Sequence, residues 1–205
     1  MKFERTTALL ALCGVVTLAT TGCAPQAVRG GPGTSRPDFD NPAMSVTLDR
    51  EDITYMVADY LGRMETSRFW QDTIKGASTR PTIAVWPIQN ATTQHLDEAM
   101  LTLLSSIETA LVNTGEVRVV DRASQEMLAR EVGIQHGGIY DPASAQKLGK
   151  QLGVQYFVTG KITSIDEKLK KQRRVQYSLF LQVIEIETGL IEFQNEVTRT
   201  KGLKS

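Results

Sequence analysis

The spacing of apolar residues along the chain alternates between the period of a helix and that of a strand. From Asp49 they recur three and four positions apart, which predicts an amphipathic helix beginning there. Its apolar stripe consists of Ile53, Met56, Val57, Tyr60, Leu61 and Met64. A second stripe of the same period consists of Leu96, Met100, Leu103, Leu104, Ile107, Ala110 and Leu111. Gly115 ends this second helix, a short helix covers "SQEMLAREV", and a further one begins at the capping residue Asp141 with Pro142 and ends at Gly153.

Runs of β-branched and aromatic residues predict five strands, at about residues 82–88, 116–121, 154–166, 174–188 and 190–198. Thr188 and Gly189 mark a tight turn between the last two. In the last strand, Ile191, Phe193 and Val197 alternate with polar residues, so one face of it is expected to be wet. The order α-β-α-β-α-α-β-β-β predicts a single α/β domain, residues 49–205, with a mixed sheet packed by helices.

Residues 1–22 have the pattern of a secretory signal peptide. Lys2 and Arg5 give a basic start, and the uncharged run Ala8 to Ala19 follows. Twelve helical residues are too short to span a bilayer of about 30 Å. No later segment is long and apolar enough to cross a membrane.

The sequence "Thr21-Gly22-Cys23" resembles the lipobox of bacterial lipoproteins, in which the cysteine receives a diacylglycerol and a further acyl chain. Only Cys13 could pair with Cys23, and it would leave with the signal peptide, so a disulfide is not expected. Cleavage before Cys13 is less suitable because Leu12 is bulkier than Gly22. The resemblance implies that Cys23 is lipidated. Because no Asp follows Cys23, it also implies that the lipoprotein lies in the outer membrane. The alternative is an ordinary secreted protein.

From Ala24 to about Thr47 the chain is rich in Pro, Gly and Ser, which predicts a flexible tether. We therefore expect the lipidated cysteine and its tether to occupy residues 23–48. The mature chain, residues 23–205, holds 21 basic and 22 acidic residues. Without a basic excess, a nucleic-acid partner is not expected.

No catalytic residues, metal site or cofactor are recognisable, and no small-molecule substrate is expected. There is no Gly-x-Ser-x-Gly elbow, and "TGKIT" at Thr159 is no phosphate loop because Ile162 stands where Ser or Thr is needed. His95 and His136 have no metal-binding neighbour at helical spacing. Asp49 and Asp52 fit a helix N-terminus and are assigned no other role. The pattern favours a binding module.

Two segments are candidate partner-binding sites. The first is the basic run "KLKKQRR", interpreted as a hairpin tip that is solvated, meets phospholipid headgroups or contacts a partner; its basic residues are Lys168, Lys170, Lys171, Arg173 and Arg174. The second is the loop from His136 to Tyr140, where an anion could bind before the capped helix. The pair Phe69 and Trp70 is interpreted as a plug at the edge of the core, with a partner-binding patch as the alternative.

Four blocks, "TIAVWPIQNATT", "ALVNTGEVRVVDR", "DPASAQKLGKQLGVQYFVTGKITSI" and "LQVIEIETGLIEF", resemble in order and spacing the LpoB family of lipoproteins that activate penicillin-binding proteins. The likeness covers about Asp49 to Lys201, and related folds include the amino-terminal domain of TolB-type proteins. The resemblance implies a domain that is anchored in the outer membrane, faces the periplasm, and stimulates a bifunctional penicillin-binding protein in cell-wall synthesis. The alternative is a structural or assembly lipoprotein of a flagellar or curli-secretion machine.

Overall fold

The structure is a computed structural model that describes residues 30, 33–38, 42–131, 147 and 149–204. The chain divides into two units, Met1–Phe39 and Asp40–Ser205. In the first unit, Gly30 and Arg36 form an isolated bridge, and the backbone N–H of Arg36 donates to the hydroxyl of Thr34 (3.3 Å). The second unit contains all the helices and strands described below.

The helices of the second unit form where the apolar stripes predict them. Helix α1 (Arg50–Glu65) buries all six residues of the first stripe. A single turn of π-helix, η1 (Phe69–Ile74), follows it. Helix α2 (Asp97–Asn113) ends before Gly115, whose φ of +73° is the left-handed conformation that favours glycine. Helix α3 (Arg122–Glu131) is the short helix, and Lys147 and residues 149–152 are helical too.

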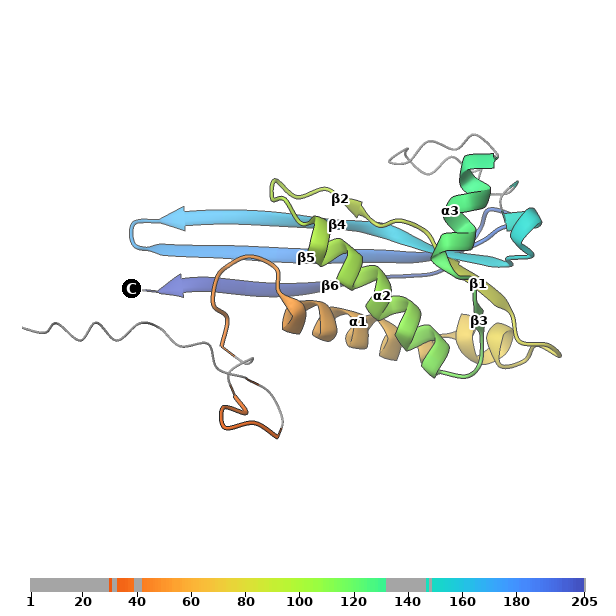
Figure 1. Cartoon of the computed structure of the whole chain (residues 1–205), viewed down its shortest axis with the longest axis horizontal. Coiled ribbons are helices and arrows are strands. Elements are labelled where there is room, and N and C mark those ends of the chain that lie inside the picture. The colour runs from red at the N-terminus through yellow and green to blue at the C-terminus, as the bar shows by residue number, and fades with distance from the viewer. Residues whose placement is uncertain (1–29, 31–32, 39–41, 132–146, 148, 205) are drawn as a thin grey trace, which may run out of the picture. The chain divides into compact units, whose positions relative to one another are not determined.

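A mixed sheet with the order β3-β1-β4-β5-β6 carries these helices (Figure 1). Its parallel part consists of β1 (Thr82–Val85) between β3 (Arg118–Val119) and β4 (Tyr156–Leu169), and the short β2 (Gln89–Asn90) adds to β4. Its antiparallel part consists of β4, β5 (Gln172–Glu185) and β6 (Ile191–Lys204), three strands of 14 residues each. These long strands extend beyond the helices at one end and close there in the β4–β5 turn (Figure 1).

The main core lies between this sheet and the pair α1–α2. On β5, every second residue on that side is fully buried: Val175, Tyr177, Leu179, Leu181 and Val183. Residues that alternate with these along the strands face the other side, where a smaller cluster is formed by Ala84, Val154, Phe157 and Ile186. Gly149 comes so close to Ile186 that an added Cβ would lie 2.6 Å from its Cγ2. The sheet is thus covered by α1 and α2 on one face, except where the long strands extend beyond these helices (Figure 1), and only partly on the other.

The predicted single α/β domain with a mixed sheet packed by helices is confirmed. The described elements follow the predicted order with η1 and β2 in addition, and the start of the helix predicted from Asp141 lies outside the described residues. The structure also differs at the ends of several strands and in the burial of one residue. β4 and β6 continue past their predicted ends to Leu169 and Lys204, and β5 begins at Gln172 and ends at Glu185, before the predicted residue 188. The expected strand 82–88 stops at Val85, and Ile191 is 52% exposed although the alternation of β6 would bury it. The folded unit also begins before Asp49, because Val46 and Leu48 are buried in the core.

Candidate functional site

The segment predicted to be a tether meets the folded unit at residues 46–49, which we call the tether junction. Asp49 caps α1: its carboxylate accepts from the backbone N–H of Asp52 (3.0 Å), and the carboxylate of Asp52 accepts from the N–H of Asp49 (3.2 Å). This reciprocal capping box fixes where the helix begins. It also leaves two carboxylates side by side, so that a cation is needed close by.

Lys201, on β6, supplies that cation. Its ammonium group donates to the carbonyl oxygen of Thr47 (2.8 Å), to the carboxylate of Asp52 (2.9 Å) and to that of Asp49, so all three of its donors are used. The side chains of Lys201 and Asp52 are only 4% and 5% exposed. Arg199, on the same strand, donates to Asp52 (3.2 Å). The last strand is therefore joined to the start of the first helix through buried charges.

The electrostatics of this network keep its groups ionised. Burial alone would lower the pKa of Lys201, but its hydrogen bonds to Asp49 and Asp52 and their negative charge raise it above 10.5. Burial would likewise raise the pKa of Asp49, yet the bond from Lys201, the backbone N–H of Asp52 and the charge of Lys201 hold it below 3.8. Both shifts favour the folded state over the pH range in which both groups are charged.

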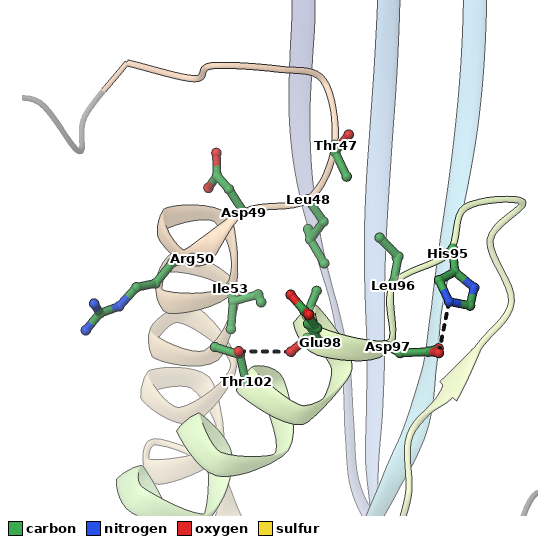
Figure 2. Close-up of a pocket in the computed structure, with 11 residues that line it drawn as sticks. Thr47, Leu48, Asp49, Arg50, Ile53, His95, Leu96, Asp97, Glu98 and Thr102 are labelled. Atoms are coloured by element: carbon green, nitrogen blue, oxygen red, sulfur yellow. Dashed lines mark hydrogen bonds and ion pairs between the residues drawn. The ribbon is translucent and has the colours of Figure 1, made fainter. Parts of the chain in front are cut away.

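A second contact holds the junction from β5. The hydroxyl of the buried Tyr177 donates to the carbonyl oxygen of Val46 (3.0 Å), and the side-chain amide of Gln94 lies 2.7 Å from the same hydroxyl. Beside it, a pocket of about 630 Å³ opens between the first turns of α1 and α2 (Figure 2). One wall of the pocket is made by residues 47–53 and the other by residues 95–102. The junction thus borders a surface depression.

This pocket carries no arrangement for acid–base chemistry. His95 forms an ion pair with Asp97 (3.1 Å) at its rim (Figure 2), but the two side chains are 90% and 75% exposed. No group of three or more potential metal ligands occurs among the residues that the structure describes. The pocket is therefore a depression in the surface, lined mostly by polar residues, beside the tether junction.

The basic run lies at the end of the hairpin formed by β4 and β5, which we call the hairpin tip (Asp166–Arg174). Only Lys170 and Lys171 form its turn, and both are exposed, as is Lys168. Arg173 belongs to β5 and binds Asp166 through two bonds (3.1 and 2.6 Å). Arg174 binds Glu167 in the same way across the two strands. The structure thus brings the five predicted basic residues together at one end of the sheet. Two of them, Arg173 and Arg174, form ion pairs with acidic residues of β4.

The remaining residues singled out in the sequence lie either outside the described part of the chain or in the core. Cys23, His136 and Tyr140 lie outside the described residues. Phe69 and Trp70 are 5% and 1% exposed, which confirms the core interpretation. Within the described part of the chain, no helix is long and apolar enough to cross a membrane.

The tether junction is the feature that the sequence interpretation missed. Asp49 and Asp52 do cap the helix, but the expectation that they serve no other role is wrong, since both bind Lys201. The sequence of the last strand could have indicated this contact. Arg199 and Lys201 continue the alternation of Phe193 and Val197, and so they lie on the face of β6 that is turned to the core. A charged residue at such a position needs a buried counter-charge.

Comparison with known proteins identifies the family of this domain. A family model described as peptidoglycan-synthase activator LpoB matches residues 52–198. The chain belongs to the LpoB family. No curated protein sequence matches it at a significant level.

Solved structures of LpoB proteins agree with the fold described here. The C-terminal domain of LpoB from Salmonella enterica is 16% identical, with a TM-score of 0.51; the match covers 72% of this chain and 98% of that domain. The C-terminal domain of LpoB from Escherichia coli gives the same identity, TM-score and coverage. At this identity the likeness concerns the fold, whereas membership of the family rests on the match over residues 52–198.

Proposed function

We propose that this protein is an outer-membrane lipoprotein, anchored through acyl chains on Cys23, whose domain binds and stimulates a bifunctional peptidoglycan synthase of the penicillin-binding class. The observation that carries the proposal is the match to the activator family, which extends from α1 to β6. The lipobox-like "Thr21-Gly22-Cys23" supports the anchor. An activator of this kind acts by contact and not by chemistry of its own.

The organisation of the chain suits such a role. A spacer rich in Pro, Gly and Ser precedes a folded unit that begins by Val46. A stable contact between two proteins buries about 1,200–2,000 Å² in total, with a few residues dominating the affinity. The second unit, Asp40–Ser205, is large enough to offer a surface of that size.

The test is a polymerisation assay with purified components. The lipidated mature chain is added to a bifunctional penicillin-binding protein and lipid II, and the rates of glycan polymerisation and cross-linking are measured. We expect both rates to rise and to saturate with the concentration of the activator. An unchanged rate, together with recovery of flagellar or secretion components in pull-downs from envelope extract, would contradict the proposal.

A matched control separates the domain from the anchor. A Cβ at Gly160 would lie 2.0 Å from the carbonyl oxygen of Phe180, so Gly160→Val cannot be accommodated in the β4–β5 ladder. This variant keeps the lipid and the tether but loses the folded domain. We expect it to reach the membrane and to leave the rate of synthesis unchanged.

A further inference from the structure

The tether junction fixes the chain to the sheet before the first helix begins. The hydroxyl of Tyr177 donates to the carbonyl oxygen of Val46 (3.0 Å), and the ammonium group of Lys201 donates to that of Thr47 (2.8 Å). Val46 and Leu48 are buried beside these bonds. In Figure 2 the chain passes the strands at Thr47 and Leu48 before it turns into α1. A pull on the chain from its amino-terminal side therefore reaches these contacts before it reaches the helix.

The two donors stand on strands that lead to the opposite end of the domain. Tyr177 lies on β5, which is paired with β4 on one side and with β6 on the other. Lys201 lies on β6, opposite Val175 of β5. Tyr177 is fully buried and the side chain of Lys201 is 4% exposed, so water does not compete for either bond. A force on residues 46–47 thus passes to two strands of the sheet and not to the first turn of α1.

The polar chemistry of the junction suits resistance to force better than it suits equilibrium stability. A buried ionic group is weak evidence for stability, because apolar residues of the same volume are often as stable or more so. Lys201 nevertheless uses all three of its donors on the junction and on Asp52. A hydrogen bond is lost once its donor and acceptor are about 3.6 Å apart. Of two contacts with equal energy, the one that is lost over the shorter displacement withstands the larger force.

We propose that the tether junction is a mechanical clamp, which carries the load between the amino-terminal anchor and the domain and passes it to β5 and β6. The proposal rests on the lipid anchor of the proposed function. A chain that is anchored through Cys23 and bound to a synthase through its domain is pulled at the junction whenever the two attachment points move apart. Any chain under tension transmits the pull, whatever its conformation. While the clamp holds, α1 keeps its packing on β6.

Arg199 offers a natural comparison, because it holds the chain after the junction. It donates to Asp52 (3.2 Å), and its guanidinium carbon lies 4.5 Å from the centre of the Tyr55 ring. Both partners belong to α1, so a pull on the helix itself loads Arg199. A pull on residues 46–47 does not load it until the clamp has opened. Two basic residues on the same strand are therefore expected to respond to different points of pulling.

Single-molecule stretching tests the clamp. Residues 23–205, without lipid, contain one cysteine, Cys23, which lies where the proposed anchor acts. The first handle is attached there, and the second at Leu190→Cys, an exposed position (60%) between β5 and β6. Both strands that carry the clamp lead to this second handle. In the comparison protein Cys23→Ser is introduced and the first handle is moved to Glu51→Cys, an exposed position in α1.

The parent domain should survive longer when it is pulled through Cys23 than when it is pulled through Glu51→Cys at the same constant force. We expect a difference of at least about fivefold in lifetime, the factor that corresponds to one hydrogen bond. Equal lifetimes would overturn the proposal. So would a short extension at low force that frees the chain up to residue 49 before the domain unfolds, because the junction would then be the first part to yield.

Two variants separate the clamp from general stability. Tyr177→Phe keeps the buried ring and removes one bond of the clamp, so the lifetime should fall about fivefold when the domain is pulled through Cys23. It should change by less than about twofold in the other geometry, where the load does not cross this bond. Arg199→Met is the matched control and should shorten the lifetime only when the domain is pulled through Glu51→Cys. Equal losses for Tyr177→Phe in both geometries would show that its bond serves stability alone.

The clamp and the proposed function fail in distinguishable ways. If the lifetimes follow the expected pattern but the lipidated chain stimulates no synthase, the proposed function is wrong and the mechanical property of the junction stands. If the lipidated chain stimulates a synthase but the two pulling geometries give equal lifetimes, the proposed function stands and the clamp is wrong.

Discussion

The tether junction and the hairpin tip are both built from paired basic and acidic side chains, on neighbouring strands of the sheet, but their exposure to solvent is opposite. At the junction, Lys201 is 4% exposed and has all its donors bound. At the tip, the pair Arg174–Glu167 is more than half exposed on both sides, and the lysines of the turn face solvent. Charges that lie a few residues apart along β5 and β6 thus differ mainly in their access to water.

Burial decides what each cluster can do. A buried ionic group that loses its partner cannot be resolvated, so the junction holds the structure together and tolerates little change. Exposed ion pairs contribute little to stability because water and salt screen them. The junction is a structural element, whereas the ion pairs at the tip are solvated.

The largest expected effect is that of Lys201→Met. It leaves two neighbouring carboxylates, one of them buried, without their main counter-charge, and should lower the free energy of unfolding by about 3–5 kcal/mol. Chemical denaturation of the mature chain measures it. The control is Lys161→Met, an exposed lysine on β4, expected to change stability by less than about 0.5 kcal/mol. Similar losses of unfolding free energy in both variants would show that the burial of Lys201 does not increase its contribution to stability.

The stability should depend on pH at both ends of the scale. Asp49 has a folded pKa below 3.8, so its contribution is present above that value and is lost as the pH falls through the folded pKa. Lys201 has a folded pKa above 10.5, so its contribution is present below 10.5 and is lost as the pH rises through the folded pKa. Melting temperatures measured across pH should give a plateau between these limits. A Lys201→Met variant with the same acid limb as the parent would contradict the assignment.

Two tyrosines allow a buried hydroxyl that has a hydrogen-bond partner, in Tyr177, to be compared with one that has none among the described residues, in Tyr60. The hydroxyl of Tyr60 is buried, and the described residues offer it no hydrogen-bond partner; its ring packs edge-on against Phe193. Tyr60→Phe should therefore raise the free energy of unfolding by about 1 kcal/mol. Tyr177→Phe should lower it by a similar amount, since its hydroxyl holds Val46. Changes of the same sign in both variants would contradict this account.

The smallest effect is expected at the tip. Arg173→Ala removes the partner of Asp166 at a partly exposed position, and should change the melting temperature by no more than about the error of the measurement. A marked destabilisation would show that the long hairpin depends on its cross-strand ion pairs.

Most of the fold follows from local patterns in the sequence. The stripe from Ile53 to Met64 and that from Leu96 to Leu111 place α1 and α2, and the glycines at 115 and 153 end helices with positive φ. The positions of the outer ends of the three long strands did not follow, since β4 and β6 run on to Leu169 and Lys204 and β5 begins at Gln172. These outer ends are mostly polar, so hydrophobic alternation fades, and pairing between strands keeps them extended.

The candidate site was predictable only where its residues are neighbours in sequence. The basic tip is visible as a run of letters, although the compensation of Arg173 by Asp166 needs the hairpin register. The junction joins Asp49 to Lys201 across almost the whole domain. No local pattern connects two such positions, and the capping box explained Asp49 and Asp52 well enough without a third partner.

The bond between Lys201 and Thr47 also orders the events of synthesis. Lys201, which holds the start of the first helix in place, is synthesised 154 positions after Thr47, its partner. Until it has been synthesised, α1 has neither its strand β6 to pack on nor the cation for its two carboxylates. The domain therefore has no finished intermediate before β6 has been synthesised. Its fold is completed only when β6 pairs with β5 and packs against α1.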